Sequence, residues 1–290
     1  MAAASTPLQA LSARVFVTPI GKDTANCGAL LSPCRTFAGA VAAVSPGGTV
    51  VPLTPGEYGP VTISKALTIE ANGVTALVQT TGTAITVNAG PSDVVTLRGL
   101  VLTNPGRAAQ GILVNSAAAV HVEKCTISNF VDAVAAFSWG TGRLFLTDST
   151  MRNNDQGLRA TSTGAGLDIT IERCVFESNN AGIVVQDGTR TAIRASIASG
   201  NLSGLIAQST VGSVDLTVAD CLVSHNTGYG IDSEGSSATV RVSASTVTGN
   251  QIGLVQYYPS GPSTLLSRGD NTVEANGTPT FGTIGSYTAK

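Results

Sequence analysis

Residues 169–185 read ITIERCVFESNNAGIVV and contain three short runs in which apolar and polar residues alternate. The runs are Ile169–Ile171, Val175–Glu177 and Gly182–Val185, and polar residues such as Asn179 separate them. Alternation with a period of two predicts β-strands, and the polar residues between the runs predict turns. This stretch therefore predicts a unit of three strands joined by tight turns.

The same unit recurs along the chain at spacings of 22 to 26 residues. Its clearest mark is a column of asparagines: Asn104, Asn129, Asn153 or Asn154, Asn179, Asn201, Asn226, Asn250 and Asn276. A repeat of this length with three strands predicts one all-β solenoid, a right-handed parallel β-helix of nine to ten coils. Asparagine suits such a column because it tolerates a left-handed turn and its amide can hydrogen-bond along the stack.

Five cysteines divide into two groups. Cys27 and Cys34 occupy one polar turn, which predicts a disulfide between them. The remaining thiols belong to strand-like segments two coils apart: Cys125, Cys174 and Cys221. Two coils span roughly 9 to 10 Å, whereas a disulfide needs Cα atoms within about 7 Å. We therefore expect these three thiols to be buried and reduced, with Ser149 and Ala195 stacked between them.

The repeats predict a single β-helix domain over residues 15–290. Three segments do not follow the repeat: residues 1–14, about 34–45 and about 270–290. The first is expected to be a flexible tail or the remnant of a trimmed export signal. The second is expected to be an N-terminal cap helix, because Phe37, Val41 and Val44 share one apolar face. The third is expected to be an irregular C-terminal cap, since a solenoid must cover its last layer.

Charge and composition exclude several functions. The chain carries 16 Lys and Arg against 18 Asp and Glu, a net charge of −2, which argues against a nucleic-acid partner. No run of about 18 apolar residues is present, so no membrane span is expected. The two histidines, His121 and His225, lie in separate segments, and no paired Cys-x-x-Cys motif accompanies them. We therefore predict no metal site from these residues.

Four N-terminal motifs carry a family resemblance: GKDTANC at 21–27, PCRTFAGA at 33–40, GGTVV at 47–51 and PGEYG at 55–59. Together they resemble the N-terminal module of the pectin-lyase-like right-handed parallel β-helix superfamily. Within it, the chain is most similar to small exported bacterial β-helix proteins without an assigned reaction. The resemblance implies that fold, a secreted or cell-envelope location, and a role connected with polysaccharides.

The resemblance also directs attention to catalytic motifs. Polygalacturonase-like hydrolases carry Asp-Asp, Gly-His-Gly and Arg-x-Lys, and epimerase-like proteins carry Asp-Pro-His-Glu; the sequence contains none of these. The remaining catalytic candidates form a loose set: Asp132, Asp155, Arg159 and Asp187. Asp132 is expected one coil below Asp155 and Arg159, and Asp187 one coil above them. Arg159 beside acidic residues imitates a pectate-lyase-like site, which would add Ca²⁺, but an ordinary surface ion pair is the favoured interpretation. No other cofactor is expected.

One outward-facing column of the repeat is mostly apolar. It comprises Leu113, Ala135, Arg159, Val184, Ile206, Asp232 and Val255. An apolar stripe on a soluble protein indicates a covered surface. We expect loops or the tail to cover it in a monomer, or a second subunit to cover it in a homotrimer, and an open ligand groove is the remaining alternative. Candidate sugar-stacking aromatics follow the stripe: Trp139, Tyr257 and Tyr258.

These observations favour an exported, non-catalytic binding or scaffold module with polysaccharide as its expected ligand. The first alternative is a polysaccharide lyase or glycoside hydrolase of pectin-lyase-like fold. The second is a self-assembling, trimeric β-helix.

Overall fold

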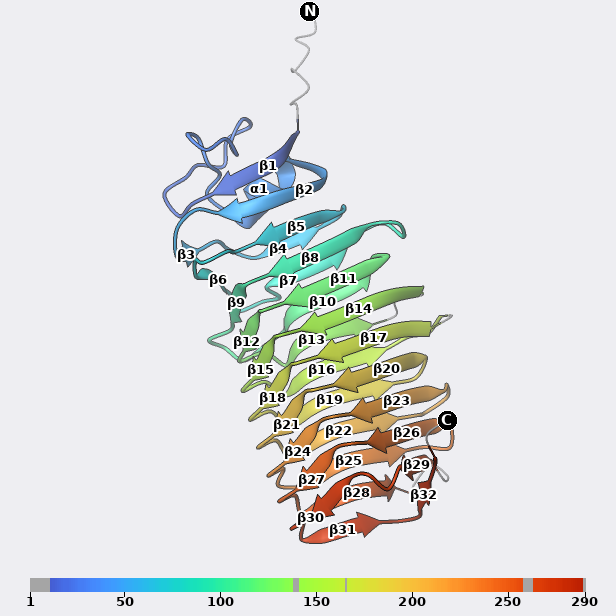
Figure 1. The fold of residues 1–290 in the computed structure, drawn as a ribbon. Helices are drawn as coiled ribbons and strands as arrows, with labels where there is room; N and C mark the ends of the chain where they lie inside the picture. The colour runs from blue at the N-terminus through green and yellow to red at the C-terminus, as the bar shows by residue number, and fades with distance from the viewer. Residues whose placement is uncertain (1–10, 138–140, 165, 258–262, 289–290) are drawn as a thin grey trace, which may run out of the picture.

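The computed structural model describes residues 11–137, 141–164, 166–257 and 263–288. Figure 1 shows these residues winding into an elongated solenoid, with the helix α1 (Phe37–Ala43) at its N-terminal end. Each coil contributes one strand to each of three parallel sheets. This architecture confirms the predicted all-β solenoid with three strands per coil.

The first sheet has twelve strands. They are β1 (Ser12–Val17), β2 (Val44–Pro52), β5 (Leu67–Glu70), β8 (Val94–Arg98), β11 (Ala119–Glu123), β14 (Thr141–Thr147), β17 (Gly166–Glu172), β20 (Thr189–Arg194), β23 (Val214–Ala219), β26 (Ala238–Ser243), β29 (Thr264–Ser267) and β32 (Ile284–Ser286).

The second sheet has ten strands and carries the site described below. They are β4 (Val61–Ile63), β7 (Ile85–Asn88), β10 (Gln110–Ser116), β13 (Asp132–Phe137), β16 (Gln156–Thr161), β19 (Ala181–Gln186), β22 (Ser203–Gln208), β25 (Tyr229–Glu234), β28 (Ile252–Tyr257) and β31 (Thr278–Phe281).

The third sheet also has ten strands, most of them three residues long. They are β3 (Gly56–Glu57), β6 (Ala76–Gln79), β9 (Leu100–Thr103), β12 (Thr126–Ser128), β15 (Thr150–Arg152), β18 (Val175–Glu177), β21 (Ile197–Ser199), β24 (Leu222–Ser224), β27 (Thr246–Thr248) and β30 (Thr272–Glu274).

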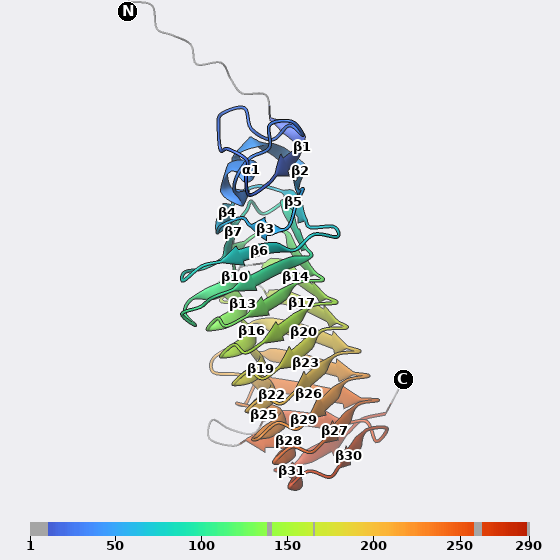
Figure 2. The ribbon, with the colours of Figure 1, turned by 90° about the vertical axis from the view of Figure 1, so that its left-hand side faces the viewer.

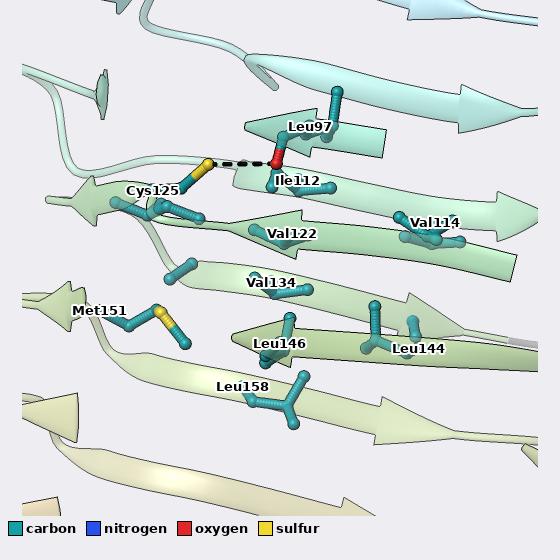
Figure 3. Close-up of a cluster of buried hydrophobic side chains, with 14 of the residues drawn as sticks. Leu97, Ile112, Val114, Val122, Cys125, Val134, Leu144, Leu146, Met151 and Leu158 are labelled. Carbon is teal, nitrogen blue, oxygen red and sulfur yellow. Dashed lines mark hydrogen bonds between the residues drawn. The ribbon is translucent and has the colours of Figure 1, made fainter. Parts of the chain in front are cut away.

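The core consists of aliphatic columns, because the in-register pairing places equivalent residues of successive coils on top of one another. Figure 3 shows one such column from the first sheet and one from the second: Leu97, Val122 and Leu146, and Ile112, Val134 and Leu158. All six side chains are fully buried. Removing apolar surface from water in every coil is the main stabilisation of the solenoid.

A ladder of asparagine side chains runs beside the third sheet. Asn179 is typical: its Oδ1 accepts from the backbone N–H of Asn154 at 2.9 Å and from the Asn154 amide at 3.1 Å. Its own Nδ2 donates to Asn201 Oδ1 at 3.1 Å and to the carbonyl of Met151. The left-handed conformation expected of these asparagines belongs in most coils to the preceding residue, for example Ser178 with φ 56°. Asn129 is the exception: it adopts the left-handed conformation itself (φ 64°), and Phe130 takes the ladder position by donating its N–H to Asn154 Oδ1, so the predicted place of Asn129 in the column is wrong. The asparagine column is therefore selected for its amide, which bonds to the neighbouring coils.

A second buried column alternates cysteine and serine: Cys125, Ser149, Cys174, Ser196, Cys221 and Ser245. The three thiols are free and buried, and Cys27 and Cys34 form a disulfide, so both cysteine predictions are confirmed. The expected position of Ala195 is wrong, because Ala195 adopts the left-handed turn (φ 49°) and Ser196 occupies the column.

Both ends differ from expectation. The helix α1 is shorter than the segment 34–45: Thr36 caps its N-terminus by accepting from the Gly39 N–H, and Val44 is already extended. Ser45 precedes Pro46, a position that disfavours helix. At the other end, β30, β31 and β32 continue the three sheets in register in place of an irregular cap. Among the described residues, no helix is long and apolar enough to cross a membrane.

Candidate functional site

A groove of about 410 Å³ lies on the outer face of the second sheet. Figure 2 shows the strands β10 to β28 of this sheet stacked one above another along the solenoid. The lining side chains come from four successive strands: Gln156, Arg159, Ala181, Val184, Gln186, Ile206, Gln208 and Glu234. The groove therefore follows the solenoid axis from β16 to β25.

The hollow arises from a local change in side-chain size. Ala181 lies in register with Gln156, and Val184 lies in register with Arg159. Short side chains on β19 thus follow long ones on β16, while the apolar side chains of Val184 and Ile206 form the floor. A surface of this kind combines an apolar base with polar walls, as ligand sites commonly do.

The first end of the groove is built around Arg159. Its guanidinium lies 4.5 Å from the centroid of the Phe137 ring, a cation–π arrangement. Its Nη1 lies 3.9 Å from Oδ1 of Asp132, whose other oxygen accepts from Gln110 Nε2 at 3.3 Å. Asp132 is 1% exposed, and this burial raises the pKa of its carboxyl despite the opposing effect of Arg159. This end of the groove therefore has the Arg159 guanidinium at the surface and the Asp132 carboxyl buried beneath it.

The other end contains a row of hydrogen-bonded amides and a carboxylate. Gln186 Nε2 donates to Gln208 Oε1, and Gln208 Nε2 donates to Glu234 Oε2, each at 2.7 Å. Asp232 lies two residues before Glu234 and is fully buried, and neither of its oxygens has a hydrogen-bond partner among the described residues. Burial, together with the neighbouring Glu234, raises the pKa of Asp232 to about 8.

The four candidate catalytic residues do not form one cluster. Asp132 and Arg159 do come together, as described above. Asp155 lies at the turn before β16, where it binds Arg107 at 3.2 Å and Asn180 at 3.3 Å. Asp187 follows the opposite end of β19 and holds a loop by accepting from Thr210 and Val211. Asp187 is therefore a structural residue, and the position one coil above Asp155 belongs to Asn180.

Of the aromatic candidates, Tyr257 lies beside the groove. It pairs in register with Glu234 and is 40% exposed. Trp139 and Tyr258 lie outside the described residues.

The apolar outward column is only partly covered. Ala135, Val184 and Val255 are buried by their neighbours within the single chain, whereas Leu113 and Ile206 are half-buried. Arg159 belongs to this column and lies in register between Ala135 and Val184. The described residues of the single chain therefore cover Ala135, Val184 and Val255 but leave Leu113 and Ile206 partly exposed, and cover of these two by a second subunit stays a prediction.

The glutamines of the groove are the main feature that sequence reasoning missed. Gln186, Gln208 and Glu234 stand in register one coil apart, two residues beyond the apolar column. The signal that could have found them is the same repeat, continued to the next outward-facing column.

No metal centre emerges from the described residues. The one group of three potential ligand atoms within 4.8 Å is formed by Asp23, Cys27 and Cys34. The two sulfurs are joined in a disulfide, and the Asp23 carboxylate accepts from the backbone of Arg35 and the hydroxyl of Thr36. These residues therefore stabilise the N-terminal cap.

Comparison with known proteins gives a consistent result for the fold. The family model described as "Right handed beta helix region" matches residues 64–214 and 110–277. A pectate lyase structure is similar at a TM-score of 0.61 and 17% identity, covering 97% of this chain and 80% of its own. The A-module of a mannuronan C-5 epimerase from Azotobacter vinelandii is similar at 0.55 and 15% identity, covering 84% and 91%. No curated protein sequence matches significantly.

Proposed function

This chain belongs to the right-handed β-helix family, with a pectin-lyase-like fold, and from that premise we propose that it binds a polysaccharide along the groove of the second sheet. The observation that carries the proposal is the continuous groove from Arg159 to Glu234. Its coils repeat at about 4.8 Å, the spacing of parallel strands, which is similar to the length of one pyranose unit. A linear sugar chain lying along the solenoid axis would therefore present successive units to successive coils.

The arrangement supports binding without bond cleavage. Glycoside hydrolysis needs two carboxyl groups separated by about 5 to 9.5 Å. Asp132 and Asp232 stand on β13 and β25, four coils apart, which corresponds to roughly 19 Å at the strand spacing. Glu234 lies close to Asp232 on β25, but Asp232 is fully buried, so Glu234 is the one carboxylate among the residues lining the groove. Arg159 lies beside Asp132 and over the Phe137 ring, so its guanidinium is already engaged by these two neighbours.

An extracytoplasmic location accompanies this proposal. The Cys27–Cys34 disulfide supports it, because disulfides persist mainly in oxidising compartments.

The proposal is tested with a panel of soluble neutral and acidic polysaccharides, scored for binding by affinity electrophoresis and for unsaturated or reducing products. We expect retardation by at least one polysaccharide and no release of products. Ala181→Phe fills the hollow and should abolish the retardation. Ala192→Phe, an equal change at an exposed position of the first sheet, is the matched control. Absence of retardation throughout the panel, or retardation that Ala181→Phe leaves intact, would refute the proposal.

A further inference from the structure

The charges along the groove are few and nearly balanced. Among its eight lining residues, Arg159 is the one cation and Glu234 the one anion. The Asp132 carboxyl already lies beside Arg159, at 3.9 Å. A polyuronate chain carries one carboxylate on every sugar, so along these four coils several negative charges would face a single, partly neutralised guanidinium. Charges brought out of water without partners cost more than they gain.

The polar side chains at the Arg159 end of the groove include both donors and acceptors. Arg159 and Gln156 line this end, and they offer a guanidinium and an amide. A ligand carboxylate is an acceptor only, so it could pair with the donors alone. A hydroxyl donates one hydrogen bond and accepts others, so it can pair with the guanidinium and with either atom of the amide.

The row of Gln186, Gln208 and Glu234 at the other end of the groove also offers both hydrogen-bond donors and acceptors. The hydrogen bonds from Gln186 to Gln208 and from Gln208 to Glu234 fix the direction of both amides. Each amide retains one free N–H and an oxygen lone pair, and Glu234 retains its second oxygen. The row therefore presents donors and acceptors together at every coil.

We propose that the groove selects an uncharged, hydroxyl-rich polysaccharide over a polyuronate, with Gln186, Gln208 and Glu234 as the specificity-determining row. This inference rests on the proposed binding function and names the class of its ligand. Glu234 contributes by placing a negative charge where an anionic chain would have to lie, and the amides contribute hydrogen bonds that hydroxyls can complete.

The test compares retardation of the full chain by soluble neutral glycans (dextran, xyloglucan and galactomannan) and by polygalacturonate and alginate. We expect the best neutral glycan to bind at least about tenfold more tightly than either polyuronate. Neutral binding should change little with salt, because no net charge is neutralised. Glu234→Gln should narrow this preference by improving polyuronate binding. Glu177→Gln, which removes a charge from the third sheet, should leave it unchanged.

The test distinguishes failure of this inference from failure of the proposed binding function. Tighter binding of a polyuronate than of every neutral glycan would overturn this inference while leaving the binding function intact. Equal effects of Glu234→Gln and Glu177→Gln on the preference would likewise overturn the inference alone. Absence of binding to both classes would overturn the proposed function and this inference together.

Discussion

The asparagine ladder and the groove treat buried polar groups in opposite ways. Asn201 is 1% exposed, and its amide oxygen and nitrogen are both hydrogen-bonded to adjacent coils. Asp132 and Asp232 are equally buried, yet three of their four carboxyl oxygens lack partners among the described residues. The ladder repeats the same residue in successive coils, so each coil supplies the partner the next one needs. Asp132 and Asp232 interrupt the repeat near the two ends of the groove, so no neighbouring coil supplies their partners.

The strongest test of this contrast removes one asparagine from the middle of the ladder. Asn201→Ala removes the amide oxygen that accepts from the Asn179 backbone N–H and from the Asn179 side-chain amide. It also removes the amide nitrogen that donates to the Phe176 carbonyl. Each orphaned buried group costs about 1 to 3 kcal/mol, so we expect the free energy of unfolding to fall by about 3 to 5 kcal/mol in urea titrations.

Asn276→Ala is the matched control, because Asn276 ends the ladder and is partly exposed. Its effect should be less than half as large. Equal losses at the two positions would show that the ladder does not stabilise through burial of satisfied amides.

The second test concerns the groove, where an unsatisfied group should destabilise. Asp232→Asn replaces a carboxyl that folding keeps protonated with a neutral side chain of the same shape. The folded pKa of about 8 exceeds the ordinary value of 3.8, so the contribution of Asp232 to the free energy of unfolding should be greatest below pH 4 and fall as the pH rises to about 8. At pH 8 the variant should therefore be more stable than the native protein, by about 2 to 4 kcal/mol.

Unfolding midpoints measured at pH 4 and pH 8 check this sign. The advantage of Asp232→Asn should be small at pH 4 and large at pH 8. Glu177→Gln serves as the control, since it removes a charge outside the groove and should show no such pH dependence. A variant that is equally stable, or less stable, at pH 8 would contradict the assignment of a protonated Asp232.

The same contrast explains what could be predicted from the sequence. Repeating columns can be recognised in a single sequence, so the three sheets, the buried thiols and the ladder positions other than Asn129 followed from spacing. The groove depends on departures from the repeat. One is the small Ala181 next to the longer Gln156, and another is the pairing of Arg159 with Asp132 one coil below. Asp187 was misplaced for a related reason: a spacing in sequence fixes the coil but not which end of the strand a turn residue occupies.

The smallest expected effect tests whether the cysteine column is part of the repeating scaffold. Cys174 stands between Ser149 and Ser196, and its N–H donates to Ser196 Oγ at 3.1 Å, a bond that does not involve its own side chain. Ser149, at the equivalent position one coil earlier, donates its hydroxyl to the carbonyl of Thr147 at 2.9 Å. A serine at 174 has the matching carbonyl of Glu172 within reach, where the thiol already lies at 3.4 Å.

Cys174→Ser should therefore change the free energy of unfolding by less than about 1 kcal/mol, because a stronger hydrogen bond offsets the loss of an apolar atom. Cys174→Leu should cost more, about 1 to 3 kcal/mol, because the closely packed column has no room for a branched side chain. In the native protein, burial raises the pKa of the Cys174 thiol to about 11, so a thiol reagent at pH 8 should label it only after unfolding. Labelling of Cys174 in the folded chain would contradict the burial of this column. An equal loss of unfolding free energy for Cys174→Ser and Cys174→Leu would show that the column is not part of the repeating scaffold.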